Sequence, residues 1–147
     1  MKIAICSDHG GFELKTRIVR FVEAMGHEVT DFGCYDECSV DYPDYAFPMA
    51  EAVARGEYER GIAICGTGIG VSICCNKVKG IRCALCGDVL SAELTRRHND
   101  SNILAMGGRI IGPETAKAIT AAWLNTPFDG GRHEGRIAKI TKYENER

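Results

Sequence analysis

The chain has 147 residues, enough for one domain with a sizeable core and too few for two large domains. Apolar residues make up 45% and charged residues 26% of it, and the formal net charge is −2 with scattered basic residues. This balance predicts a folded protein without a nucleic-acid surface, and no stretch approaches the roughly 20 apolar residues of a membrane span. The N-terminus enters an apolar run without a signal-peptide pattern, so we expect a cytoplasmic protein.

Apolar periodicity predicts strands that alternate with helices along the chain. The expected strands are 2–6, 28–32, 61–65, 81–86 and 102–106. Helical spacing predicts helices over roughly 14–25, 46–55, 70–77, 88–98 and 113–123, and a charged helix from residue 133 onward. Strands that are near-continuous apolar runs indicate a parallel sheet covered on both faces.

We therefore expect a three-layer α/β fold, Rossmann-like or flavodoxin-like. Its five-stranded parallel sheet would have the order 2-1-3-4-5, with helices on both faces. Without an internal repeat or a linker, residues 1–147 should form a single domain, in which residues 131–147 make a C-terminal helical arm.

Eight cysteines raise the possibility of a disulfide scaffold or a metal site. Disulfide scaffolds are usually shorter and rich in loops, whereas this chain has strongly periodic segments. The best metal candidate would join Cys34 and Cys38 to Cys83 and Cys86. Because residues three apart in a strand face opposite sides, Cys83 and Cys86 cannot share one ion. We expect no metal and no cofactor, and interpret most cysteines as small buried apolar residues.

The stretch from Gly61 to Ser72 carries the strongest local signal for chemistry. An apolar run ends in Cys65 and continues as Gly-Thr-Gly-Ile-Gly over residues 66–70. Glycines allow tight turning and present bare N–H groups at a helix N-terminus, which forms a cradle for an anion. The same N–H groups favour the thiolate form of Cys65. The pattern indicates either a base beside a hole for developing negative charge or a plain phosphate loop.

A second unusual loop, Ser-Asp-His-Gly-Gly at residues 7–11, follows the first strand. Ligands of open parallel sheets bind outside the carboxyl ends of the strands, at the topological switch point. In the expected order, strands one and three are neighbours there, so Asp8 and His9 should lie beside Cys65. A dinucleotide enzyme with Asp88 as the ribose-binding acid is the alternative. It is disfavoured, because the third glycine falls one residue early for Gly-x-Gly-x-x-Gly and no length remains for a substrate domain.

Five motifs occur in order over essentially the whole chain. They are Ser-Asp-His-Gly-Gly at 7–11, Asp-Tyr-Pro at 41–43, Cys-Gly-Thr-Gly-Ile-Gly at 65–70, Arg-His-Asn-Asp-Ser-Asn at 97–102 and Gly-Gly-Arg-His-x-x-Arg at 130–136. Together they resemble the ribose-5-phosphate isomerase type B family, which also contains galactose-6-phosphate isomerase subunits. The resemblance implies an aldose–ketose isomerase that interconverts ribose 5-phosphate and ribulose 5-phosphate through a cis-enediolate.

The resemblance also implies roles for the glycine loop. Cys65 would be the base that moves a proton between C2 and C1 of the sugar. The backbone N–H groups of the loop would hold the enediolate oxygens; these are the groups of Gly66, Thr67, Gly68, Ile69 and Gly70. The Thr67 hydroxyl would shuttle a proton between the two oxygens. Some family members use a glutamate just after the loop, but Val71 occupies that position here.

The remaining roles implied by the resemblance concern ring opening and substrate binding. His98 would be the acid that opens the furanose ring, Asp8 would position the sugar, and Asn99 would bind a sugar oxygen. The phosphate would contact His9, Arg132 and Arg136, with Arg109 as a further ligand-binding arginine. Tyr42 either lines the pocket or packs against the loop.

The expected topology places these groups apart. His98 ends a helix that returns from the carboxyl end of the fourth strand, and Arg132 and Arg136 follow another returning helix. They should therefore lie at the opposite end of the sheet from Cys65 of the same chain. We expect a homodimer, able to pair further into a tetramer, with active sites shared between subunits and the 131–147 arm across the interface.

Two alternatives remain open at this point. One is an isomerase of a hexose phosphate, such as allose or galactose 6-phosphate, or of a rare free sugar on the same scaffold. The other, from a different class, is a non-catalytic sensor of a sugar phosphate or a nucleotide. A sensor would have no use for a base at the position of Cys65.

Overall fold

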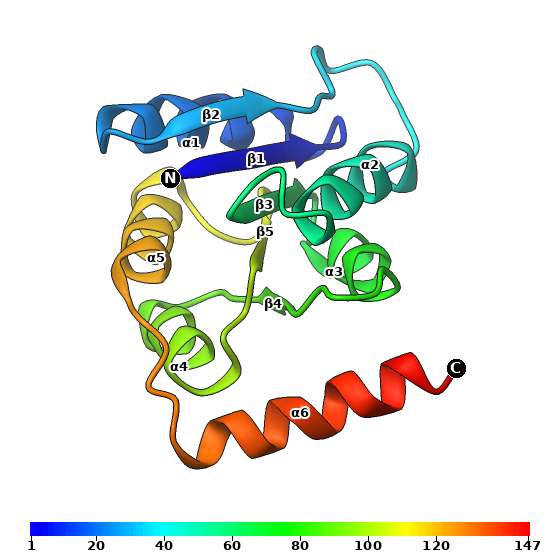
Figure 1. Ribbon diagram of the computed structural model, residues 1–147. Coiled ribbons are helices and arrows are strands. Elements are labelled where there is room, and N and C mark those ends of the chain that lie inside the picture. Colours follow the sequence, from blue (N-terminus) through cyan, green and yellow to red (C-terminus); the bar gives the residue numbers. More distant parts are fainter.

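Five parallel strands form one sheet in the order β2-β1-β3-β5-β4 (Figure 1). The computed structural model describes residues 1–147, and its strands are β1 (Lys2–Ser7), β2 (Glu28–Asp31), β3 (Arg60–Cys65), β4 (Cys83–Leu85) and β5 (Ile103–Gly107). The helices are α1 (Phe12–Ala24), α2 (Pro43–Ala54), α3 (Ile69–Asn76), α4 (Val89–Asn99), α5 (Pro113–Asn125) and α6 (Arg132–Asn145). The expected three-layer α/β architecture is confirmed.

The expected strand order 2-1-3-4-5 is wrong in its last two positions. β5 pairs with β3, and β4 is the edge strand. All five residues of β5 are buried, whereas β4 is only three residues long and ends in the exposed Leu85, so the more apolar strand takes the central place. β1 and β3 remain neighbours, and β5 now brings its carboxyl end beside that of β3.

Two element bounds also differ from expectation. β4 is shorter than the expected 81–86, and the Arg82 backbone N–H just before it donates to the Asn102 side chain at 2.8 Å. Helix α2 starts at Pro43, three residues before the expected 46. Proline at the first position suits a helix start, since that position needs no backbone donor.

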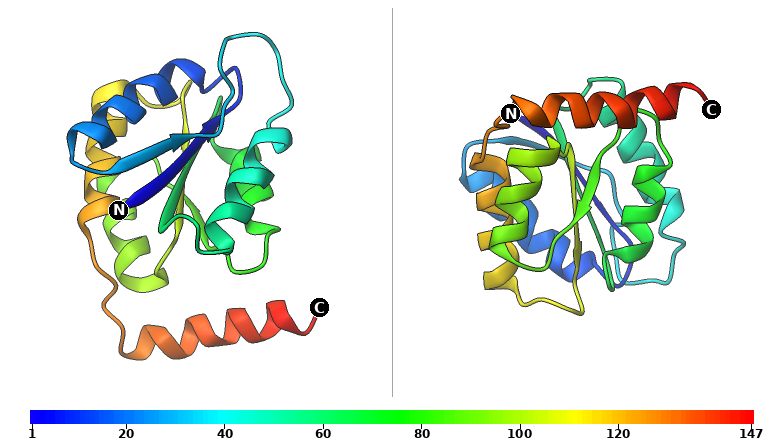
Figure 2. Two further views of the ribbon diagram at one scale, coloured as in Figure 1. Left: turned by 45° about the horizontal axis from the view of Figure 1, so that its top comes forward. Right: turned by 90° about the horizontal axis from the view of Figure 1, so that it is seen from below.

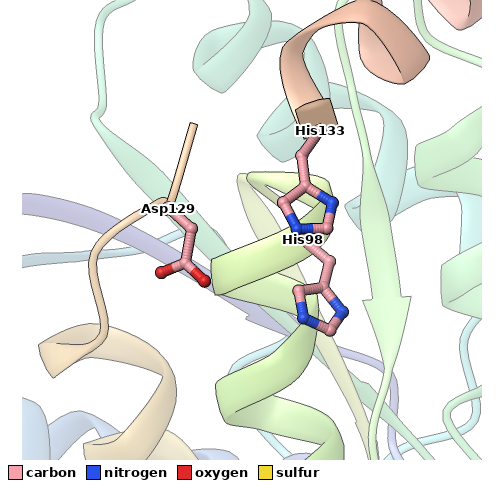
Figure 3. A group of neighbouring side chains, drawn as sticks. All are labelled: His98, Asp129 and His133. Carbon is pink, nitrogen blue, oxygen red and sulfur yellow. The ribbon is translucent and has the colours of Figure 1, made fainter. Parts of the chain in front are cut away.

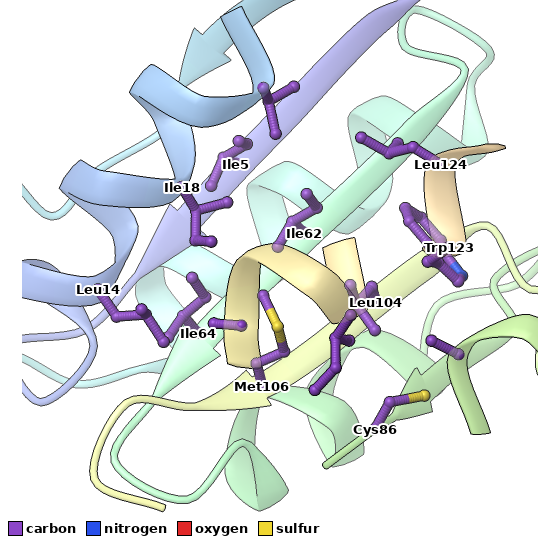
Figure 4. Packing of buried hydrophobic residues seen from close by; sticks show 14 of the residues in the cluster. Ile5, Leu14, Ile18, Ile62, Ile64, Cys86, Leu104, Met106, Trp123 and Leu124 are labelled. Atoms are coloured by element: carbon purple, nitrogen blue, oxygen red, sulfur yellow. The ribbon is translucent and has the colours of Figure 1, made fainter. Parts of the chain in front are cut away.

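The two faces of the sheet carry separate apolar layers. Strand residues such as Ile5, Ile64 and Met106 form one layer with residues of α1, α4 and α5, and Trp123 lies at one edge of that layer (Figure 4). The opposite face packs against α2 and α3 and contains smaller side chains, including Cys65. Cys83 borders this second layer and Cys86 lies in the first, so the two thiols face opposite sides of the sheet, as expected.

Helix α6 stands apart from these layers. It leaves the α4 side and crosses the β4 edge of the sheet toward the α3 side (Figures 1 and 2). Its contact with the body includes a hydrogen bond from the Gly80 N–H to the Glu144 carboxylate, at 3.0 Å. Ile140 and Tyr143 are 56% and 69% exposed, so the apolar side of this helix is largely uncovered in one chain. No helix of the chain combines the length and apolar content that a bilayer crossing requires.

Candidate active site

Three loops meet where β1, β3 and β5 end. The strand register pairs Ser7 with Ile64 and Cys65 with Gly107, so the loops that follow begin at the same level. Glycines allow the loops to touch: a Cβ atom on Gly11 would lie 2.5 Å from the Ile64 carbonyl oxygen. The expected meeting of the 7–11 loop with the glycine loop is therefore present, and the loop after β5 joins them.

Cys65 is the last residue of β3, and its side chain points toward the start of α3. The thiol is nearly buried, at 5% exposure, and Sγ accepts a hydrogen bond from the Gly68 N–H at 3.1 Å. Gly68 has φ of +80° and precedes the first residue of α3. A backbone donor at a helix N-terminus can stabilise negative charge that develops on a neighbouring group.

The loop after β1 places the Asp8 carboxylate and the His9 imidazole next to the glycine loop that follows Cys65. Asp8 is buried, and its Oδ1 atom accepts a hydrogen bond from the Gly11 N–H at 3.1 Å. His9 accepts the Val40 N–H through Nδ1 at 3.1 Å. Because Nδ1 acts as an acceptor, the proton of the neutral ring is on Nε2. His9 can therefore donate a hydrogen bond to a ligand through Nε2.

An ion pair with a buried lysine anchors the long loop that carries Val40. The Lys15 ammonium group is 1% exposed and contacts both carboxylate oxygens of Asp31, at 2.6 and 2.8 Å. It also donates to the Cys34 carbonyl oxygen at 2.5 Å. The start of the loop after β2 is thus tied to α1.

Tyr42 closes the other side of the glycine loop. Its ring packs on Gly70, where an added Cβ atom would lie 2.8–3.1 Å from three ring atoms. The ring remains 40% exposed. Tyr42 therefore packs directly against the glycine loop and still presents part of its surface to solvent.

Arg109 lies across the junction of the loops. Its side chain passes within 3.3 Å of the Cβ position of Gly66 and 3.4 Å of that of Gly10, and its N–H donates to the Gly66 carbonyl oxygen at 2.9 Å. Arg109 and His9 also line an adjoining cleft of about 530 Å³ between the loops after β1 and β5. This end of the sheet thus offers two groups that can bind an anion near the thiol.

The remaining expected site residues lie at the other end of the sheet. His98 and Asn99 end α4, whose chain then enters β5 at its amino end. The Asn99 side chain is exposed, while its carbonyl oxygen accepts a hydrogen bond from Arg82 at 2.8 Å. Arg132 and Arg136 are exposed in the first turns of α6, beside the end of α4. One chain therefore does not bring them to Cys65.

His98 has a close partner that the sequence did not reveal. Its ring stacks on that of His133, with centroids 4.6 Å apart and planes inclined by 18° (Figure 3). Asp129 completes the group, with one ligand atom from each residue within 4.8 Å of the others. Nearly parallel, stacked rings do not point their nitrogen lone pairs at a common ion, so the arrangement suits ring packing better than metal coordination.

The chain matches the family profile described as Ribose/Galactose Isomerase over residues 3–140. It belongs to this family. It is 58% identical to a Bacillus subtilis protein described as a candidate sugar phosphate isomerase, over 98% of this chain and 97% of that one. Identity to ribose-5-phosphate isomerase B of Escherichia coli is 49%, over 99% and 98% of the two chains. The solved ribose-5-phosphate isomerase B of Clostridium thermocellum has a TM-score of 0.98 at 51% identity, with 99% of each chain covered.

These similarities confirm the resemblance and the class of aldose–ketose isomerase. In this ribose/galactose isomerase three other buried cysteines are poor candidates for a base. Burial raises the pKa of Cys74, and burial with the Asp88 charge raises the pKa of Cys86 to about 11. Burial likewise raises the pKa of Cys6 well above its ordinary range. These thiols stay protonated near neutral pH, and none of them follows β3 at the glycine loop.

The sequence did not indicate a role for three residues near His98. His133 lies inside the quoted 130–136 motif, so a signal was present, but its role was not recognised. Asp129 and Arg97 form an ion pair whose Nε–O distances are 3.1 and 3.2 Å. The two residues are 32 positions apart, and no local sequence pattern predicts a contact between them.

Proposed function

We propose that this isomerase interconverts D-ribose 5-phosphate and D-ribulose 5-phosphate through a cis-enediolate, with Cys65 as the base. The observation that carries the proposal is the Cys65 Sγ atom 3.1 Å from the Gly68 nitrogen, at a helix N-terminus where three loops meet. The names of the curated and solved relatives support ribose 5-phosphate as the substrate.

The proton transfer needs one base that serves both carbons. The Cys65 thiolate takes the proton from C2 of the open-chain aldose, the C2–H electrons form the C1–C2 double bond, and the carbonyl electrons move to O1. A proton then passes from O2 to O1, and the thiol returns its proton to C1 as the C2 carbonyl forms. The thiolate is regenerated, so atoms and charge balance over the cycle.

The glycine loop would stabilise the charge that develops on the sugar oxygens. Its backbone N–H groups are held in place before the reaction, and preorganised donors can contribute several kcal/mol in a site that excludes water. Thr67 is exposed at the loop's edge, and its hydroxyl is within 3.2 Å of the Ile69 nitrogen. That hydroxyl would carry the proton between O1 and O2. Asp8 engages Gly11 through Oδ1, which leaves Oδ2 for a sugar hydroxyl.

The ring-opening acid and part of the phosphate site would come from a second subunit. His98, Arg132 and Arg136 lie at the end of the sheet opposite to Cys65, so in a two-fold dimer they can approach the partner's glycine loop. The arginine forks and His9 would hold the phosphate, with Arg109 beside them, and Asn99 would bind a sugar oxygen. The exposed apolar side of α6 supports an interface there, because Ile140 and Tyr143 would be covered by the partner. Pairing of dimers into tetramers is compatible with this interface.

A reducing compartment such as the cytoplasm suits this mechanism. Cys65 can act as a base only while it is not oxidised, and cytoplasmic conditions keep thiols reduced.

Incubation of the protein with ribose 5-phosphate in heavy water tests the proposal. We expect ribulose 5-phosphate to appear and deuterium to enter at C2 of the recovered aldose, both by NMR. Allose 6-phosphate and galactose 6-phosphate serve as comparison substrates, and a higher kcat/KM for either would assign the enzyme to a hexose phosphate. Binding of ribose 5-phosphate without ketose or deuterium would instead indicate a sensor.

A further inference from the structure

His133 is the one buried residue of α6, at 9% exposure on a helix whose other early residues are exposed. Its burial comes from the stack on His98, because the start of α6 lies against the end of α4 (Figure 3). Burial and the nearby His98, Arg132 and Arg136 lower the pKa of His133, so its ring is mainly neutral at pH 7. His133 therefore adds no further charge to a region with two arginines.

The segment between α5 and α6 is tied to α4 at two points. Asp129 accepts Arg97 Nε through both carboxylate oxygens, and its own N–H donates to the Arg97 carbonyl oxygen at 3.1 Å. Arg96 donates through Nε to the Thr126 carbonyl oxygen at 3.2 Å. Gly130 and Gly131 follow with φ of +68° and +59°, which allows the chain to turn sharply into α6. These contacts fix where His133 emerges relative to His98.

We propose that His133 is a positioning residue for His98, held in place by the Arg97–Asp129 pair, and that it orients the His98 ring for proton delivery to the ring oxygen of the cyclic substrate. This inference rests on the proposed function of His98. A histidine in the last turn of a helix can rotate about two side-chain torsions, and a packed aromatic face restricts that rotation. Orientation of a proton donor matters strongly, since a displacement of about 1 Å can cost on the order of 100-fold in rate.

The two directions of the reaction separate this role from a structural one. Ribose 5-phosphate is mainly a furanose and must be opened, whereas ribulose 5-phosphate has its C5 hydroxyl esterified and cannot close a furanose ring. Exchange of the C1 proton of ribulose 5-phosphate with heavy water therefore uses Cys65 but needs no ring opening. Loss of His98 positioning should reduce turnover of ribose 5-phosphate and spare the exchange.

The test compares His133→Ala and His133→Phe with the unmodified protein in both assays. We expect His133→Ala to lower kcat for ribose 5-phosphate by about 10-fold or more, with less than about twofold loss of exchange. His133→Phe keeps a flat ring against His98 and should restore most of the lost kcat. Asp129→Ala should show the same split more weakly, at about threefold. Glu57→Ala is the matched control, because Glu57 is likewise a carboxylate that accepts the Nε N–H of one arginine, Arg55, and should change neither assay.

Each other outcome overturns the inference. Parallel losses in both assays would mean that His133 only supports the fold. A rise in KM for both sugars at constant kcat would mean that His133 contacts the phosphate. Unchanged turnover and exchange in His133→Ala would show that His133 has no role in the reaction. An unmodified protein that neither turns over nor exchanges would contradict the proposed function itself, which is a distinguishable result.

Discussion

The Sγ atom of Cys65 lies 3.1 Å from the backbone nitrogen of Gly68, directly before the first residue of α3. The thiol thus accepts a backbone N–H at the helix N-terminus while remaining only 5% exposed. The base of the proposed proton transfer therefore lies at a helix N-terminus and is shielded from bulk water.

Cys65→Ala should abolish catalysis without abolishing binding. A general base contributes about 10²–10⁴-fold, so we expect turnover and C1 exchange to fall by at least that range. Ribose 5-phosphate should still bind, because the phosphate contacts do not involve the thiol; calorimetry measures this. The control is Cys74→Ala, which removes a second buried thiol on the adjacent helix. This variant should keep most of the activity of the unmodified protein. Normal turnover by Cys65→Ala would refute the assigned base.

Gly70 and Tyr42 should be energetically coupled. An alanine Cβ at Gly70 would lie 2.8–3.1 Å from Tyr42 ring atoms, so Gly70→Ala should displace the ring and cost about 1–2 kcal/mol. With Tyr42→Ala as background, the same change should be neutral or stabilise α3 by up to about 1 kcal/mol. A double-mutant cycle from urea denaturation measures the coupling. Equal effects of Gly70→Ala in both backgrounds would exclude the contact.

The sequence was sufficient to predict that strands alternate with helices and that the loops after the first and third strands meet. Apolar runs such as 61–65 determine buried strands, and neighbouring parallel strands bring their carboxyl ends together whichever strand lies at the far edge. The order of β4 and β5 was not predictable in this way, because both read as apolar strands. In the structure all five residues of β5 are buried, whereas β4 ends in the exposed Leu85.

The His98–His133 stack illustrates a second limit. The two residues belong to different quoted motifs, and their contact depends on the path of the chain from Thr126 to Gly131. That path is set by the ion pair of Arg97 with Asp129 and by two glycines with positive φ. Motif order predicts which residues matter, but not which of them touch.

Lys15→Met should destabilise the protein more than an exposed lysine replacement. The Lys15 ammonium group is 1% exposed and serves Asp31 and the Cys34 carbonyl oxygen, so its removal leaves these groups without their partner. Asp31 is 37% exposed and can be partly rehydrated, so we expect a loss of about 2–3 kcal/mol.

The matched control for this prediction is Lys117→Met. Lys117 contacts the exposed Glu114 at 3.4 Å, and its replacement should change stability by less than about 0.5 kcal/mol. Urea denaturation measures both variants. Similar losses of stability in the two variants would show that the Lys15–Asp31 pair contributes no more than the Lys117–Glu114 pair.

The pH dependence of stability should carry a signature of His133. Burial, His98, Arg132 and Arg136 lower the pKa of His133 below the usual 6.5, although Asp129 opposes them. The unfolded chain therefore binds this proton more readily than the folded one, and stability should fall as pH drops through about 6.5.

His133→Phe cannot take up this proton, so the variant should gain stability relative to the unmodified protein as pH falls from 7.5 to 5. His27, whose pKa is also lowered by burial and by the N-terminal amine, is present in both proteins and cancels in the comparison. A stability difference that stays constant over this pH range would contradict the lowered pKa.

Complementation between two inactive variants tests most directly whether Cys65 and His98 act from different subunits. Cys65→Ala and His98→Ala chains are unfolded, mixed in equal amounts, refolded, and assayed with ribose 5-phosphate. Half of the dimers should be mixed, and each should contain one intact site, so activity should recover to about a quarter of the unmodified level. Recovery of no activity, with mixed dimers verified by mass spectrometry, would contradict the shared active site.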